Sequence, residues 1–266
     1  MLDKKQHYLQ IALNSTLNEA QSIVSCIPLD KRIIIEAGTP LIKAYGARGI
    51  RAIRSYWEGR VFGSGVGLET FKLSTEGPWW LNLLTKSLAK KQANIKKESF
   101  GEKEEVAFTP YIIADLKCMD RGVREVEIAR QGGANAVTAL GQAPIETLDA
   151  FIEKCEEYGL DAMIDMMNVD FPLNVLRQLK KIPEVVILHR GVDEEAFNPE
   201  KEIPFHEIQR IKSDYDIMIA VAGGDTFEEA RRAIFNDADI VIVWKSFYTS
   251  SVDTAKLAQE FLKEIR

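Results

Sequence analysis

The sequence has few cysteines, no long apolar run and no excess of basic residues. Its three cysteines, Cys26, Cys118 and Cys155, are odd in number and widely spaced, without a CxxC pair or a histidine pattern. The sequence therefore predicts neither a disulfide framework nor a zinc site. The formal net charge of −6 is opposite in sign to the basic face that nucleic-acid-binding domains present. We expect no nucleic acid partner.

Segments that would target the chain to a membrane are also lacking. No apolar stretch reaches the roughly 20 residues that a membrane-spanning helix needs. Residues 1–5 lead into a polar stretch, and not into the apolar core of a signal peptide. We therefore expect a soluble, cytoplasmic protein with no membrane partner.

What the sequence does have is a repeating pattern of short β-branched runs and helical stretches. Residues 146–158 are one such stretch, because its apolar residues fall at helical spacing and cover one face. Near-continuous apolar strands joined by helices indicate a parallel sheet buried on both faces. Eight repeats favour closure into a (β/α)8 TIM barrel over an open doubly wound sheet. The runs are 8–13, 32–36, 111–117, 136–140, 161–165, 185–189, 217–222 and 240–243.

The spacing breaks once, between the second and third runs, where about 75 residues lie in place of a single helix and short loops. We predict one barrel domain over residues 1–266, with an insertion at about 57–108. Glycines at 63–67 lack the Lys-Ser/Thr ending of a phosphate-binding loop, which favours a plain turn. A helix is expected over 78–89. Because the insertion lies between a helix and a strand, we expect it at the amino-terminal face, with Trp79 and Trp80 available for subunit packing.

Acidic side chains gather at the predicted strand ends, where barrel enzymes carry their catalytic groups. They are Glu36, Asp115, Asp120 and Asp165, with Lys117 as the one cation among them. Carboxylates around a small mouth repel one another unless cations neutralise them. Oxygen ligands without a nearby cysteine or histidine pair suit Mg²⁺, and we predict Glu36 and Asp115 as its ligands. Any one of these acids alone would be read as a helix cap or a salt bridge; their grouping favours a site.

Two further features lie at predicted strand ends. His189 ends the sixth run, a position where barrels place general acids or bases; the alternative is a core histidine with a structural role. Gly223 and Gly224 follow the seventh run directly. Loops at that place commonly hold a phosphate through backbone N–H groups, although a tight turn is the alternative.

The segment ADLKCMDRG at 114–122 resembles the DxKxxD motif of the orotidine monophosphate decarboxylase superfamily. The segment EAGTPLI at 36–42 resembles the second-strand motif of one branch of that superfamily. The branch contains 3-hexulose-6-phosphate synthase and 3-keto-L-gulonate-6-phosphate decarboxylase. The similarity continues in order through LHRGVD at 188–193 and AVAGG at 220–224.

This resemblance implies a role for each candidate residue. Glu36 and Asp115 would bind Mg²⁺, and Lys117 would stabilise an enediolate of a sugar phosphate. Asp120 would reach the site of the partner subunit in a homodimer, and His189 would transfer protons. The residues that resemble the synthase pattern within the branch are Asp165, Val192 and Ala222.

Two positions depart from the family. Asn14 stands where the first strand usually ends in aspartate, which removes a charge and keeps a hydrogen-bonding amide for the substrate. Trp244 and Lys245 stand where the family has a glycine pair or Gly-Arg, so we expect Gly223, Gly224 and Lys245 to hold the phosphate.

The function that the resemblance implies is a magnesium-dependent aldolase, which joins formaldehyde to ribulose 5-phosphate or runs in reverse. Two alternatives remain open. One is a decarboxylase of a β-keto acid sugar phosphate, and the other is a barrel that binds a sugar phosphate without turnover.

Overall fold

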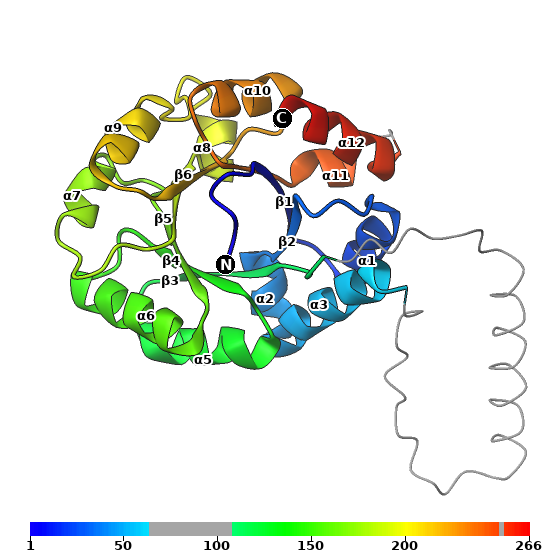
Figure 1. Ribbon diagram of the computed structural model, residues 1–266, viewed down its shortest axis with the longest axis horizontal. Helices are drawn as coiled ribbons and strands as arrows, with labels where there is room; N and C mark the ends of the chain where they lie inside the picture. Colours follow the sequence, from blue (N-terminus) through cyan, green and yellow to red (C-terminus); the bar gives the residue numbers. More distant parts are fainter. Residues whose placement is uncertain (64–107, 250–252) are drawn as a thin grey trace, which may run out of the picture.

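The computed structural model describes residues 1–63, 108–249 and 253–266. Eight parallel strands close into one barrel in sequence order (Figure 1), which confirms the predicted (β/α)8 fold. The runs expected to form β2, β3 and β7 are each shifted or trimmed by one residue, and the other five match. The bounds are β1 Tyr8–Leu13, β2 Ile33–Ala37, β3 Ile112–Cys118, β4 Ala136–Leu140, β5 Asp161–Asp165, β6 Val185–His189, β7 Met218–Ala222 and β8 Ile240–Val243.

Helices form a ring around the strands (Figure 1), because each parallel connection has to return the chain to the same end of the sheet. The helix expected over 146–158 is confirmed as α6. No helix in the described part of the chain has both the length and the apolar character of a membrane span. The bounds are α1 Leu17–Cys26, α2 Thr39–Tyr45, α3 Ala47–Val61, α5 Gly122–Gly132, α6 Ile145–Tyr158, α7 Pro172–Leu176, α8 Val192–Phe197, α9 His206–Asp214, α10 Phe227–Phe235, α11 Lys245–Thr249 and α12 Thr254–Glu264.

Alternation along the strands divides the apolar residues into two cores. In β2, Ile33 and Ile35 pack outward in the layer between strands and helices, whereas Ile34 packs inside the barrel. The interior core also contains Ile113 of β3 and Ile187 of β6. Because side chains two positions apart on a strand share a face, Glu36, Asp115 and His189, two positions after these interior residues, point into the barrel mouth.

The helix α3 continues to Val61, past position 57, near which the insertion was predicted to begin. Ile50, Ile53, Trp57 and Val61 recur at helical spacing and are buried, so they form the inner face of one helix. The Trp57 ring also contacts Phe108, with ring centroids 6.0 Å apart. The chain therefore leaves and rejoins the barrel at neighbouring points of the amino-terminal face. The glycine-rich piece, Trp79, Trp80 and the helix expected over 78–89 lie outside the described residues.

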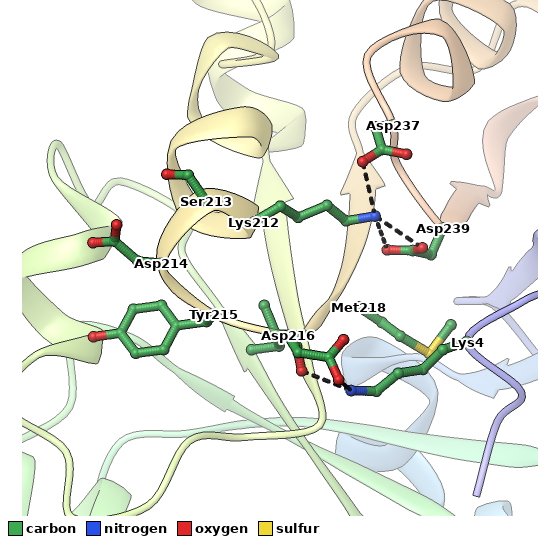
Figure 2. Close-up of a pocket in the computed structure, with 10 residues that line it drawn as sticks. Lys4, Lys212, Ser213, Asp214, Tyr215, Asp216, Met218, Asp237 and Asp239 are labelled. Atoms are coloured by element: carbon green, nitrogen blue, oxygen red, sulfur yellow. Dashed lines mark hydrogen bonds and ion pairs between the residues drawn. The ribbon is translucent and has the colours of Figure 1, made fainter.

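A cavity of about 400 Å³ lies at the amino-terminal face, beside the start of β7 (Figure 2). Its charged groups pair with one another. Lys212 Nζ lies 2.9 Å from Asp239 Oδ2 and 3.4 Å from Asp237 Oδ2, and Lys4 Nζ lies 2.9 Å from Asp216 Oδ2. The first set of pairs connects α9 to the loop that leads into β8, and the other connects the amino-terminal segment to the loop that leads into β7. Residues at this face of a barrel commonly serve stability rather than chemistry.

Candidate active site

A second cavity, of about 600 Å³, opens at the carboxyl ends of the strands. Residues from all eight strands line it, as expected for a barrel active site. The predicted site residues that line it are Asn14, Glu36, Asp115, Lys117, Asp165, His189 and Gly223, together with Trp244. The structure thus brings together most of the residues that were predicted from strand ends.

Strand alternation explains why three of these side chains meet. Glu36 follows the interior residue Ile34 by two positions, and Asp115 follows Ile113 by two. His189 follows Ile187 in the same way. Each polar side chain therefore continues an apolar interior row and points into the mouth.

Lys117 reaches the cavity through an irregular backbone. The pairing of β3 with β4 shifts between Ala114 and Cys118, and Lys117 has a φ of 45°, a left-handed conformation that is uncommon outside glycine. Its Nζ lies 2.6 Å from Asp165 Oδ2 and 3.3 Å from Asp115 Oδ2. Local strain of this kind gathers at functional sites. The ammonium group is held between two carboxylates.

The charged groups of this cluster determine the protonation states of Lys117 and Asp165. Burial lowers the pKa of Lys117, but Asp115 and Asp165 outweigh burial and raise it above its usual range. Burial likewise opposes the ionisation of Asp165, but His189 and Lys117 hold its pKa well below the usual range. Lys117 is therefore a cation and Asp165 an anion at neutral pH.

Glu36 and Asp115 are buried carboxylates with incomplete partners. Gln10 Nε2 donates to Glu36 Oε2 at 2.5 Å, and Thr39 Oγ1 donates to Asp115 Oδ2 at 2.8 Å. The other oxygen of Asp115, Oδ1, is buried and has no hydrogen-bond partner among the described residues. Burial, followed by the charge of Asp115, raises the pKa of Glu36 to about 8. Both observations show that the protein only partly compensates the negative charge of an ionised Glu36–Asp115 pair.

These residues fit a hard divalent cation. An unpartnered carboxylate oxygen beside a buried glutamate offers the oxygen ligands that Mg²⁺ prefers. Within the described residues, no three His, Cys, Asp or Glu side chains form a set that could enclose a metal. A cation on Glu36 and Asp115 would therefore take its other ligands from substrate and water.

Three predicted residues do not line the cavity. Asp120 is exposed, and its Oδ1 accepts a hydrogen bond from the backbone N–H of Arg121 at 2.7 Å. Gly224 packs against Glu229 and Ile203. Lys245 is exposed, and its Nζ lies 3.6 Å from Glu195 Oε1.

Asn14 and Gly223 occupy the places expected of them. Asn14 Oδ1 lies 1.8 Å from the point where a Cβ at Gly38 would stand, so glycine at 38 is what allows the Asn14 amide to sit there. Gly223 has a φ of 90°, and a Cβ there would lie 2.2 Å from the Arg190 carbonyl oxygen. The loops after β6 and β7 are thus in close contact.

Gln10, Thr39 and Arg190 were not predicted as site residues. Gln10 carried a usable signal, because it precedes the interior residue Ala12 by two positions and had to point inward. The sequence gives no comparable signal for Thr39 and Arg190, because their contacts depend on how α2 and the loop after β6 pack.

The closed barrel and its charged mouth define a (β/α)8-barrel protein with its polar groups at the carboxyl ends of the strands. The model of the Orotidine 5'-phosphate decarboxylase / HUMPS family matches residues 100–261, and the chain belongs to this family.

Relatives and solved structures agree with that assignment. The chain is 32% identical over 259 residues to "Bifunctional enzyme Fae/Hps" of Methanocaldococcus jannaschii, covering 97% of this chain and 52% of that protein. The chain spans about half the length of the curated relatives it matches. The fold is similar to a structure of 3-hexulose-6-phosphate synthase from Salmonella typhimurium, with a TM-score of 0.68 and 24% identity over 97% of this chain and 98% of that one. The fold is also similar to a structure of 3-keto-L-gulonate-6-phosphate decarboxylase from Vibrio cholerae, with a TM-score of 0.64 and 16% identity. The match covers 98% of this chain and 97% of that one.

Proposed function

We propose that the protein is an aldolase of the 3-hexulose-6-phosphate synthase type, which joins formaldehyde to ribulose 5-phosphate or catalyses the reverse reaction. One observation carries the proposal: Lys117, Asp165 and His189 form a single hydrogen-bonded cluster. Beside it lie Asp115, with a buried oxygen that has no partner in the described part of the chain, and Glu36, whose pKa is raised by burial and by Asp115. The names of the relatives and of the solved structures support it. The synthase structure from Salmonella typhimurium has more sequence identity to this chain, 24% against 16%, than the decarboxylase from Vibrio cholerae.

The chemistry requires a carbanion equivalent at C1 of ribulose 5-phosphate. A base removes a C1 proton, and the electron pair passes into the C2 carbonyl to give an enediolate. C1 then attacks the carbon of formaldehyde, and the formaldehyde oxygen takes up a proton to become the new hydroxyl. A bound Mg²⁺, held by Glu36 and Asp115, would supply Lewis-acid stabilisation of the substrate oxygens.

The residues of the cavity suit these steps. Lys117 remains protonated between its carboxylates and places a fixed positive charge where the enediolate oxygen becomes negative. His189, oriented by Asp165 at 2.8 Å, transfers the proton to or from the new hydroxyl. Asn14 contacts a substrate hydroxyl with its amide, and the loop at Gly223 receives the phosphate end.

We further propose that two subunits form a homodimer in which Asp120 completes the site of the partner. Asp120 is exposed and does not line the cavity of its own chain, which leaves its side chain available to a neighbouring subunit.

The test is to incubate the protein with Mg²⁺ and a panel of pentulose and hexulose phosphates, with and without formaldehyde, and to identify products by mass spectrometry. The proposal expects a hexulose phosphate only when formaldehyde and ribulose 5-phosphate are both present. Release of carbon dioxide from 3-keto-L-gulonate 6-phosphate, without aldol product, would identify a decarboxylase. Binding of sugar phosphates without any product would identify a non-catalytic barrel.

A further inference from the structure

The backbone N–H groups that follow β8 are already bound within the protein. Oδ1 of Asp225, in the loop after β7, accepts hydrogen bonds from the N–H of Trp244 at 2.8 Å and of Lys245 at 3.1 Å. Ser246 Oγ donates to the Asp225 carbonyl oxygen at 2.6 Å. Asp225 thus connects the two loops that commonly hold a substrate phosphate in barrel enzymes.

Among the residues that the structure describes, the ionic groups around these loops include more carboxylates than cations. Arg190 Nη2 lies 3.3 Å from Glu229 Oε1, and Lys245 Nζ lies 3.6 Å from Glu195 Oε1. Asp225 adds a third carboxylate to these two pairs. A phosphate arriving here meets a surplus of negative charge, in contrast to the cationic or backbone-donor surroundings that bind phosphates well.

The Asp225 carboxylate is itself only partly compensated. Burial raises its pKa, and the charge of Glu195 adds to the rise, against the hydrogen bonds from the backbone N–H groups. A second anion brought to the same donors would therefore compete with Asp225. Because Asp225 is tethered beside those donors, its effective concentration there is far above that of a free ligand.

We propose that Asp225 is a specificity-determining residue, which occupies the two backbone donors after β8 and thereby limits the affinity of the cavity for the phosphate group of its substrate. The inference rests on the proposed function, since it takes a sugar phosphate as the ligand. On this side of the cavity the phosphate is left with the backbone around Gly223, which lines the cavity and lacks the Cβ that would obstruct close approach.

The test titrates the protein, and its Asp225→Asn and Asp225→Ala variants, with inorganic phosphate and with ribulose 5-phosphate by calorimetry. Asparagine removes the charge and keeps an oxygen for the Trp244 N–H, whereas alanine releases both donors. We expect both ligands to bind about tenfold more tightly to Asp225→Asn, and more tightly still to Asp225→Ala. The affinity for unphosphorylated ribulose should not change.

Asp253→Asn is the matched control. Asp253 also accepts a backbone N–H, that of Ala255 at 2.8 Å, but it caps α12 and does not connect the loops that follow β7 and β8. Its substitution should leave the affinity for phosphate unchanged. An equal gain in this variant would overturn the proposal, because the gain would then follow from net charge alone.

Unchanged or weaker phosphate binding by a folded Asp225→Asn variant would also overturn the proposal, and Asp225 would then only connect two loops. Circular dichroism and thermal unfolding show whether each variant is folded; where Asp225→Ala does not fold, Asp225→Asn decides. Binding of inorganic phosphate needs no turnover. A chain that binds phosphate more tightly after Asp225→Asn, yet makes no aldol product, would therefore contradict the proposed function and support this inference.

Discussion

Nδ1 of His189 lies 2.8 Å from Oδ2 of Asp165, and the same oxygen lies 2.6 Å from Lys117 Nζ. Asp165 is almost fully buried, with an exposed fraction of 1%, and its ionised oxygen has only acceptor capacity. The proton of the His189 ring therefore belongs on Nδ1, which leaves Nε2 to exchange protons with a ligand. Asp165 thus sets the tautomer of His189 and the position of the Lys117 ammonium group.

Asp165→Asn should separate these effects from simple packing. The amide keeps the shape of the carboxylate but provides an N–H where Nδ1 now donates, and it removes a charge that holds Lys117. We expect kcat for aldol formation to fall on the order of 10²-fold or more, the range of a general acid or base. The affinity for Mg²⁺ should change far less, because Asp165 is not a proposed ligand. Steady-state kinetics and calorimetry measure the two quantities, and an unchanged kcat would contradict this role for Asp165.

Glu36→Gln and Asp115→Asn should each weaken binding of Mg²⁺. Loss of an outer-sphere partner costs roughly 10- to 100-fold in metal affinity, and loss of a direct ligand should cost at least as much. Glu184→Gln is the control, because Glu184 is a half-buried carboxylate that accepts the N–H of Ala162 at the opposite end of the barrel. If Mg²⁺ affinity by calorimetry were the same in all four proteins, the ligand assignment would be wrong.

Gln10→Met should weaken the same metal site indirectly. Gln10 is 1% exposed, and its Nε2 donates to Glu36 Oε2, so it fixes the orientation of a proposed ligand. Methionine keeps a similar volume inside the barrel and removes the donor. We expect about a tenfold loss of Mg²⁺ affinity, with the barrel still folded by circular dichroism. Retention of full affinity would show that Glu36 needs no such support.

The part of the site that was predictable from the sequence is the part that strand alternation controls. Glu36, Asp115 and His189 each stand two positions after an interior apolar residue, and this spacing alone places them at the mouth. Strand alternation does not explain the position of Lys117. Its pairing with Asp165, 48 residues along the chain, depends on a left-handed residue in a shifted strand register, which no spacing rule encodes.

Contacts made by loops and insertions were harder to predict. The insertion was predicted to begin at about residue 57 from the wide spacing of two strands, whereas the apolar stripe of α3 continues at helical spacing to Val61. The bond from the Trp244 N–H to Asp225 connects two loops, and the sequence shows only that both residues follow strands. Tertiary packing decides such contacts, and local pattern does not.

The proposed homodimer can be tested by complementation. Lys117→Ala should inactivate the site of its own chain, whereas Asp120→Ala should inactivate the site of the partner. Mixing the two inactive variants should restore part of the activity, because one of the two sites in a mixed dimer keeps both residues. Lys117→Ala mixed with Lys117→Met is the control and should remain inactive. If the first mixture were equally inactive after subunit exchange was shown by mass spectrometry, Asp120 would not act across an interface.

Stability at alkaline pH should depend on Tyr111, which lies inside the barrel near its amino-terminal end. Its hydroxyl donates to Asp161 Oδ2 at 2.5 Å, and the side chains of Tyr111 and Asp161 are both buried. Burial, followed by the negative charge of Asp161, raises the pKa of Tyr111 well above 10. In the unfolded chain the phenol ionises with a pKa of about 10.

Tyr111→Phe should therefore make stability less dependent on pH in the alkaline range. Below about pH 10 both states of the intact protein hold the phenolic proton, and the contribution of the Tyr111 hydrogen bond is fully present. As pH rises above that value, the unfolded chain loses the proton before the folded protein does. The free energy of unfolding then falls, by up to about 1.4 kcal/mol per pH unit for this one group.

The Tyr111→Phe variant should begin about 1–3 kcal/mol less stable, because Asp161 loses its donor. Because phenylalanine cannot ionise, the stability of the variant should decline less steeply as pH rises. Urea unfolding of both proteins between pH 8 and 11 measures the two slopes. Other ionisable groups are shared by the two proteins, so parallel curves would show that Tyr111 does not hold its proton in the folded state as its surroundings require.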